Sequence, residues 1–298
     1  MKHTFIMIEK KAHLSISNSQ LIIHYEEDEI SVPVEDITVI LLDHREITIT
    51  KEVFSWSTRY NICLVFTDYR HNPHCSLLPF HGNTLQTKTL PFQSRMTNTF
   101  KNKLWRTIVK AKITNQYLVL ERQGIVSNKF KGFIKQVELG DKTNIEAQAA
   151  KMYFKLLFGN DFARQQDGED AINVYLNYNY SIVRAMIGRS IAATGLHPSF
   201  GIWHSNQYDP MPLASDLMEP IRPIVDNYIK EYIKKKDVKK LRFEKSDRAH
   251  FIKIINETCL VVDKATIVDR AIPIYISSVK SIICEEEKPF LKLPKIIL

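Results

Sequence analysis

A change in the spacing of apolar residues near Met96 is the feature that most constrains the fold of this chain. Before it, short runs rich in β-branched residues and bounded by charged or turn residues indicate β-strands. These runs lie at residues 21–25, 30–34, 37–42, 47–49 and 62–66. After it, apolar residues recur every three or four positions, which indicates one buried face of a helix. Helices are predicted from Met96 to Ile113 and near residues 128–137, 143–158, 177–194, 213–235 and 247–258.

These two periods predict an α+β fold, in which a small β-rich N-terminal domain precedes a larger α-helical domain. We place the first domain at residues 1–80, a linker at 81–95 and the helical domain at 96–298. The linker prediction rests on His, Asn, Pro and Gly residues at turn-like positions between residues 67 and 95. Thr50 is expected to cap a short helix between the last two strands.

The formal net charge of +8 is distributed unevenly along the chain. Residues 1–90 carry 8 Lys/Arg and 11 Asp/Glu, a net charge of −3, whereas residues 91–298 carry 33 and 22, a net charge of +11. A basic domain favours a polyanionic partner, most often nucleic acid. Charge alone leaves this open, because many basic proteins have no such partner.

The spacing of the cysteines and the hydropathy of the chain exclude several classes of protein. Four scattered cysteines show no C-x-x-C spacing, which argues against structural zinc or a disulfide framework and fits a reducing cytoplasm. The apolar run at the N-terminus is too short for a signal peptide, and the longest runs fall below the roughly 18 residues of a membrane span. We therefore expect a cytoplasmic protein that does not enter a membrane.

Glu146 lies on the inward face of its predicted helix, because the residues three, four, seven and eight positions later are alanine or aromatic. A carboxylate on a buried face is costly unless it is paired, hydrogen-bonded or bound to a metal. One alternative is a capping box, in which Glu146 bonds back to the backbone of Thr143.

His204 stands in a polar loop beside Trp203, and Glu219 follows fifteen residues later in an apolar helix. Asp216 precedes Glu219 by three positions, so the two carboxylates share one helix face. A histidine beside a tryptophan is more often a packed residue than a ligand. The helix dipole explains Asp216 about as well as metal binding does.

These side chains together offer one imidazole nitrogen and two or three carboxylates. Such a set suits Mg²⁺ or Mn²⁺ better than structural zinc, and the nitrogen favours Mn²⁺. In a basic helical domain, it predicts a metal-assisted reaction at a phosphodiester. The chain shows no P-loop and no convincing Ser-His-Asp or Cys-His arrangement.

Four segments carry a resemblance to a known family. They lie at residues 144–150, 176–181, 195–204 and 212–223 and read NIEAQAA, LNYNYS, GLHPSFGIWH and PLASDLMEPIRP. In order and spacing they resemble the Cas1 family, the CRISPR-associated integrases and endonucleases of spacer acquisition, and most of all its members from type II systems. The resemblance implies that Glu146, His204 and Glu219 form the catalytic metal site, with Asp216 a possible fourth ligand.

The resemblance also implies the reaction and the partners. The 3′-hydroxyl of a short DNA fragment attacks a phosphodiester at the edge of a CRISPR repeat, so the protein needs no nucleophile of its own. The implied partners are double-stranded DNA, a second copy of the chain bound through the β-rich domain, and a small second Cas protein. Candidate DNA contacts, chosen by position, are Arg184, Arg189, Arg222 and Tyr178. The alternatives are a non-catalytic dimeric DNA-binding scaffold and a plain metal-dependent nuclease.

Overall fold

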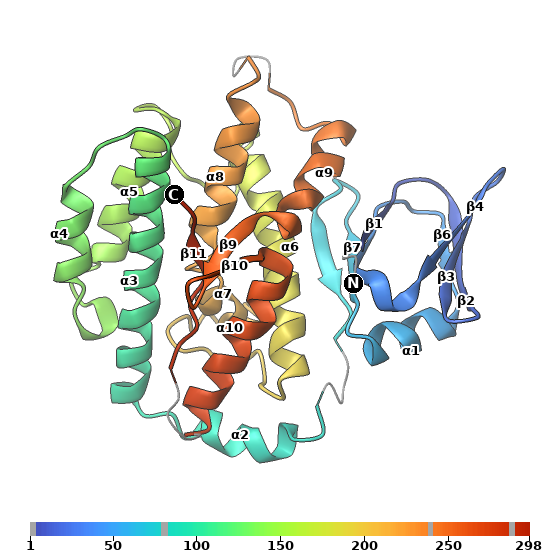
Figure 1. The fold of residues 1–298 in the computed structure, drawn as a ribbon, viewed down its shortest axis with the longest axis horizontal. Helices are drawn as coiled ribbons and strands as arrows, with labels where there is room; N and C mark the ends of the chain where they lie inside the picture. The colour runs from blue at the N-terminus through green and yellow to red at the C-terminus, as the bar shows by residue number, and fades with distance from the viewer. Residues whose placement is uncertain (1–3, 79–82, 238–240, 286–289) are drawn as a thin grey trace. The chain divides into compact units, whose positions relative to one another are not determined.

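The computed structural model describes residues 4–78, 83–237, 241–285 and 290–298. The chain forms two compact units, Met1–Thr84 and Leu85–Leu298. Figure 1 shows strands concentrated in the first unit and helices in the second. An α+β fold was predicted, and it is confirmed.

Two four-stranded sheets build the N-terminal unit. The first has the order β1 (Thr4–Ile8), β5 (Ile37–Leu42), β7 (Cys63–Thr67) and β8 (Pro73–Ser76). The second has the order β4 (Glu29–Pro33), β3 (Gln20–His24), β2 (Ala12–Ser17) and β6 (Ile47–Ile49). In the first sheet β1, β5 and β7 run parallel, and the run ITVILL of β5 is buried almost throughout, as expected for a central parallel strand.

Side chains from both sheets share one apolar core, which includes Ile8, Leu14, Ile23 and Leu64. A 3₁₀ turn (Val34–Asp36) and helix α1 (Lys51–Arg59) complete the unit. Thr50 occupies the N-cap position of α1 as predicted, but its side chain makes no capping hydrogen bond.

The second unit is mainly helical. Its helices are α2 (Gln86–Ser94), α3 (Asn98–Arg122), α4 (Lys129–Gln136), α5 (Ile145–Phe158), α6 (Ala171–Ala193), α7 (Pro212–Leu217), α8 (Arg222–Ile233), α9 (Lys245–Phe251) and α10 (Val268–Ile283), with 3₁₀ turns at Leu139–Asp141 and Ile252–Asn256. The long helices α3 and α6 both contact α7 and α8, and α6 also packs against α10. Buried residues line most of α6, which places it inside the unit.

A small sheet of three strands lies among these helices (Figure 1). It has the order β10 (Lys264–Ile267), β9 (Thr258–Val261) and β11 (Lys295–Ile296). Asn115 on α3 holds its last strand, because Nδ2 donates to the carbonyl of Pro294 at 2.9 Å and Oδ1 accepts from the N–H of Ile296 at 3.2 Å. A buried amide thus ties β11 to α3.

Several sequence predictions need correction. The linker predicted at 81–95 is wrong for residues 86–94, which form α2 and belong to the helical unit, while residues 81 and 82 lie outside the described residues. The helix predicted at 213–235 is two helices, α7 and α8, because Pro220 and Pro223 interrupt the backbone bonding between them. The sequence interpretation also missed α10 and the strands β9 to β11.

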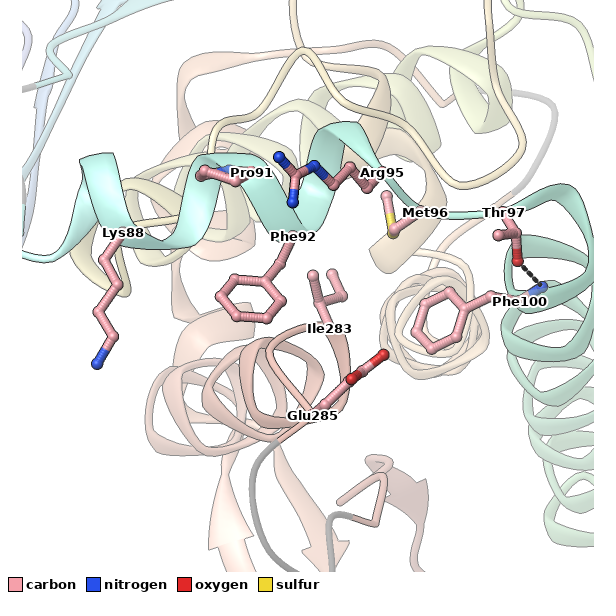
Figure 2. A pocket seen from close by; sticks show the side chains of 9 residues that line it. All are labelled: Lys88, Pro91, Phe92, Arg95, Met96, Thr97, Phe100, Ile283 and Glu285. Carbon is pink, nitrogen blue, oxygen red and sulfur yellow. Dashed lines mark hydrogen bonds between the residues drawn. The ribbon is translucent and has the colours of Figure 1, made fainter.

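One pocket of about 470 Å³ opens between α2, the start of α3 and the end of α10. Figure 2 shows Phe92, Phe100 and Ile283 facing one another across it, with Lys88 and Arg95 at its edge. None of the predicted site residues lines this pocket.

Among the described residues, no helix combines the length and the apolar character that crossing a membrane requires.

Candidate metal centre

Two of the predicted carboxylates meet at a cation supplied by the protein itself. The Nζ atom of Lys112, on α3, lies 2.6 Å from Oε1 of Glu146 and 2.5 Å from Oε2 of Glu219. Lys112 is 8% exposed and is one of the buried residues of α3. Burial by itself disfavours the charged amine, but the two carboxylates outweigh it and raise the pKa of Lys112 above its ordinary value. The structure therefore brings together three residues that are distant in the sequence: Glu146 follows Lys112 by 34 positions, and Glu219 follows Glu146 by 73.

Glu146 is free to reach Lys112 because another residue caps its helix. The carboxylate of Asp141 accepts the N–H groups of Ile145 and Glu146, each at 2.9 Å. Asn144, at the N-cap position, has a left-handed backbone and makes no side-chain cap bond. The capping box between Thr143 and Glu146, which the sequence left open, is therefore not how this helix begins.

Glu219 lies in the break between α7 and α8, and its side chain is 4% exposed. Its Oε1 accepts from Nε of Arg222 at 2.9 Å, and its Oε2 faces Lys112. Burial alone would raise the pKa of Glu219, but Arg222 and Lys112 lower it to about 2. The carboxylate is thus held ionised by two cations, the buried Lys112 and the half-buried Arg222.

Asp216 organises the loop that carries His204. Its buried carboxylate accepts the backbone N–H groups of Ile202, Trp203 and His204 at 2.6, 3.0 and 3.0 Å. Its Oδ1 also lies 2.6 Å from Nδ1 of His204. Because an ionised carboxylate only accepts, Nδ1 carries the proton and the neutral ring keeps its lone pair on Nε2.

Gly201 makes this loop possible by its lack of a side chain. A Cβ atom at this position would lie 2.4 Å from the carbonyl oxygen of His204 and 3.3 Å from Oδ2 of Asp216. The first distance is too short for any Cβ contact, so only glycine fits the backbone here.

The ring of His204 packs edge-on against Trp105 of α3, with centroids 5.8 Å apart, and Trp105 stacks on Trp203 at 5.6 Å. The imidazole is nevertheless 43% exposed. The hydrogen bond that His204 donates to Asp216 raises the pKa of His204, and it outweighs the opposing effect of burial. His204 can therefore be both a packed residue and a metal ligand, because its ring packs against Trp105 while the imidazole stays partly exposed.

The donor set fits a hard divalent ion in its chemistry, with two carboxylates and an imidazole whose Nε2 carries the lone pair. Both carboxylates already converge on a positive charge. Within the described ranges, however, no group of three or more His, Cys, Asp or Glu side chains is arranged around one point where an ion could sit. The ammonium of Lys112 instead stands between Glu146 and Glu219.

The residues predicted to contact DNA are partly or fully buried in the structure. Tyr178 is 1% exposed and packs against Phe243 at 5.0 Å, so the prediction that it reaches DNA is wrong for this structure. Arg222 is committed to Glu219 and to the ring of Tyr180, 4.5 Å away, which also leaves it poorly placed for a phosphate. Arg184 bonds to Asp209 and Ser215, and Arg189 is half-buried.

Sequence reasoning missed Lys112 and Trp105. The signal for Lys112 was present, since it stands four residues after Ile108 and directly before Ile113 on the apolar face of α3. A lysine on a buried helix face requires an anionic partner. The sequence could not name that partner.

A comparison with family models assigns the chain. The model of the CRISPR associated protein Cas1 matches residues 5–258, which is most of the chain. The chain belongs to the Cas1 family. The resemblance drawn from the four segments is thereby confirmed.

One relative of this Cas1 family member spans almost its whole length. It is 30% identical over 294 residues to the CRISPR-associated endonuclease Cas1 of Neisseria meningitidis serogroup C (strain 8013), covering 98% of this chain and 96% of that protein. Among solved structures it is similar to a casposase bound to integration product, with a TM-score of 0.77 and 19% identity over 97% of this chain and 92% of that one. A partial Cas6-RT-Cas1–Cas2 complex gives a TM-score of 0.64 at 16% identity over the whole of both chains. At such identities the structural likeness shows a shared fold.

Proposed function

We propose that this protein is a metal-dependent DNA integrase and endonuclease that inserts short DNA fragments into a CRISPR repeat array. The observation that carries the proposal is the convergence of Glu146 and Glu219 on a cation in a chain of the Cas1 family. The endonuclease name of the Neisseria relative and the integration product bound to the similar casposase support it.

The proposed roles follow from the geometry. Glu146, Glu219 and Nε2 of His204 would hold Mg²⁺ or Mn²⁺, which supplies Lewis-acid activation of the attacking 3′-hydroxyl and neutralises the phosphate oxygens. Asp216 is a positioning residue and not a ligand, because each of its oxygens already accepts two hydrogen bonds. It fixes the ring and the tautomer of His204.

Transesterification by DNA requires no protein nucleophile, because the attacking hydroxyl belongs to the fragment. One phosphodiester bond forms as another breaks, so the chemical step consumes no nucleotide. The proposed partners are double-stranded DNA, a second copy of this chain and a small second Cas protein. The +8 charge and the similar Cas1–Cas2 complex support them.

The pairing of Lys112 favours one other candidate, a non-catalytic DNA-binding scaffold. In that function Glu146 and Glu219 would serve only as partners of Lys112 and Arg222. The two candidates differ in their response to divalent ions.

An integration assay separates these candidates. The protein, with a short fragment and a supercoiled plasmid bearing a repeat, is expected to give joined product with Mn²⁺ or Mg²⁺ and none with EDTA. Glu146→Gln and His204→Ala are expected to lose that product. Asp161→Asn, which neutralises an exposed carboxylate of the same unit, is the matched control and should keep it.

Two outcomes contradict the proposal. Joined product from both Glu146→Gln and His204→Ala would show that the site assignment is wrong. Cleaved plasmid without any joined fragment would identify a nuclease instead. A scaffold would bind DNA equally well with and without the ions.

A further inference from the structure

The candidate metal centre is already electrically balanced by the protein's own side chains. Lys112 and Arg222 contribute two positive charges, and Glu146 and Glu219 contribute two negative charges, in one set of direct ion pairs. A divalent ion added to this set would introduce two positive charges beside a buried ammonium. Repulsion between such charges is strong where water is excluded.

Each oxygen of Glu219 also faces one of the two cations. Oε1 accepts from Arg222 at 2.9 Å and Oε2 lies 2.5 Å from Lys112. An ion that binds to Oε2 of Glu219 therefore competes with the ammonium of Lys112 for that oxygen.

Lys112 is the cation that can withdraw. Arg222 is fixed by its planar guanidinium, which bonds to Glu219 and lies over the ring of Tyr180 at 4.5 Å. Lys112 carries a compact ammonium on a flexible stem of four carbons, so its charge is less tightly fixed in direction than that of a guanidinium. Its ammonium also stands between Glu146 and Glu219, the place toward which both carboxylates point.

We propose that Lys112 is the resident counter-cation of this centre: its ammonium holds Glu146 and Glu219 together in the metal-free protein, and a divalent ion binds by displacing it. The inference rests on the proposed metal-dependent function and adds a residue to it. In this role Lys112 is a positioning residue, since it sets the geometry of the carboxylates before the ion arrives.

Removing this charge has opposite effects on stability and on metal affinity. Without Lys112 the carboxylates of Glu146 and the buried Glu219 repel each other, so the metal-free protein is less stable. The same change frees the carboxylates, so the ion no longer competes with an ammonium. A lysine with a merely structural role would not give tighter metal binding when it is removed.

The test measures Mn²⁺ binding by titration calorimetry and thermal unfolding in EDTA, with full-length protein. Lys112→Met is expected to lower the unfolding temperature in EDTA and to bind Mn²⁺ about tenfold more tightly or better. Mn²⁺ should also raise its unfolding temperature by more than it raises that of the wild type. Lys112→Arg, which keeps the charge, should bind no more tightly than the wild type.

Lys110→Met is the matched control, because Lys110 lies on the same helix, is half-buried and makes no ion pair with the residues that the structure describes. It should leave the Kd for Mn²⁺ unchanged. Should Lys112→Met fail to fold in EDTA, Lys112→Gln takes its place, and the same tighter binding of Mn²⁺ is expected. Recovery of folding by either variant on adding Mn²⁺ supports displacement, and continued unfolding in saturating Mn²⁺ overturns it.

The outcomes separate this inference from the function on which it rests. An affinity of Lys112→Met equal to or weaker than that of the wild type overturns the displacement and leaves the metal site standing. Absence of Mn²⁺ binding in the wild type and in Lys112→Met alike overturns both.

Discussion

Asp216 holds His204 at two points, because its Oδ1 accepts the backbone N–H of His204 at 3.0 Å and lies 2.6 Å from the ring Nδ1. Its Oδ2 accepts two further N–H groups of the same loop. One buried carboxylate therefore sets both the loop and the ring that the loop presents. This arrangement makes His204 dependent on a residue twelve positions later in the chain.

Asp216→Asn is expected to destabilise the protein by about 3 kcal/mol, because a neutral amide cannot accept all four bonds and turns a donor toward other donors. Urea unfolding measures the loss. Asp161→Asn, at an exposed position, should stay within about 0.5 kcal/mol of the wild type. An unchanged free energy of unfolding for Asp216→Asn would show that these bonds do not hold the loop.

Gly201→Ala is expected to cost about 2 kcal/mol or more, since the new methyl would overlap the carbonyl oxygen of His204 and force the loop to move. Integration activity should fall with it. Gly132→Ala offers a control of opposite sign: it lies within α4, where the nearest atom to a new Cβ is a side-chain nitrogen 3.8 Å away. That variant should gain about 0.5–1 kcal/mol. Equal responses of the two variants in urea unfolding would contradict this reading of the loop.

Arg222→Met is expected to cost about 3–5 kcal/mol, because it leaves the buried carboxylate of Glu219 with one cation in place of two. Arg184→Met breaks a pair with Asp209 whose side chains are 30% and 18% exposed, so it should cost only about 1 kcal/mol. Chemical denaturation of both variants in EDTA checks the difference. A larger loss for Arg184→Met would refute the ranking.

Asp226 should make stability depend on pH near neutrality. Burial raises the pKa of Asp226 to about 7, and Tyr180 donates a hydrogen bond to its carboxylate. Its ordinary value is 3.8, so between pH 3.8 and 7 the folded state binds more protons than the unfolded state. The stabilisation is therefore complete below about pH 4 and declines as pH rises through 7, by at most about 1.4 kcal/mol per pH unit.

Asp226→Asn removes the titrating carboxyl. The free energy of unfolding of this variant should therefore decline less than that of the wild type between pH 4 and 8. Urea titrations at several pH values give the comparison, and the other ionisable groups contribute equally to both proteins. Parallel curves for the two proteins would refute a raised pKa at this position.

Much of the fold was accessible from local pattern. The run ITVILL at 37–42 predicted a buried strand, and the apolar spacing from Phe100 to Ile113 predicted α3, because both signals arise within a few residues of chain. Helix α10 carries a similar pattern, from Ala271 to Ile283. It was not predicted because Pro273, inside the segment, argues against a helix. The strands β9 to β11 are too short to give a periodic signal, and they depend on partners such as Asn115.

The sequence by itself determined the two-part architecture, the family and the residue types of the candidate centre, since periodicity and motif spacing are written along the chain. Only the tertiary structure decided how those side chains are paired. It assigned the capping of α5 to Asp141, the orientation of His204 to Asp216 and the balancing charge to Lys112. Ion pairs and buried hydrogen bonds join residues brought together by packing. A pattern read along one helix can show that a buried charge needs a partner, but only the packing of the helices identifies it.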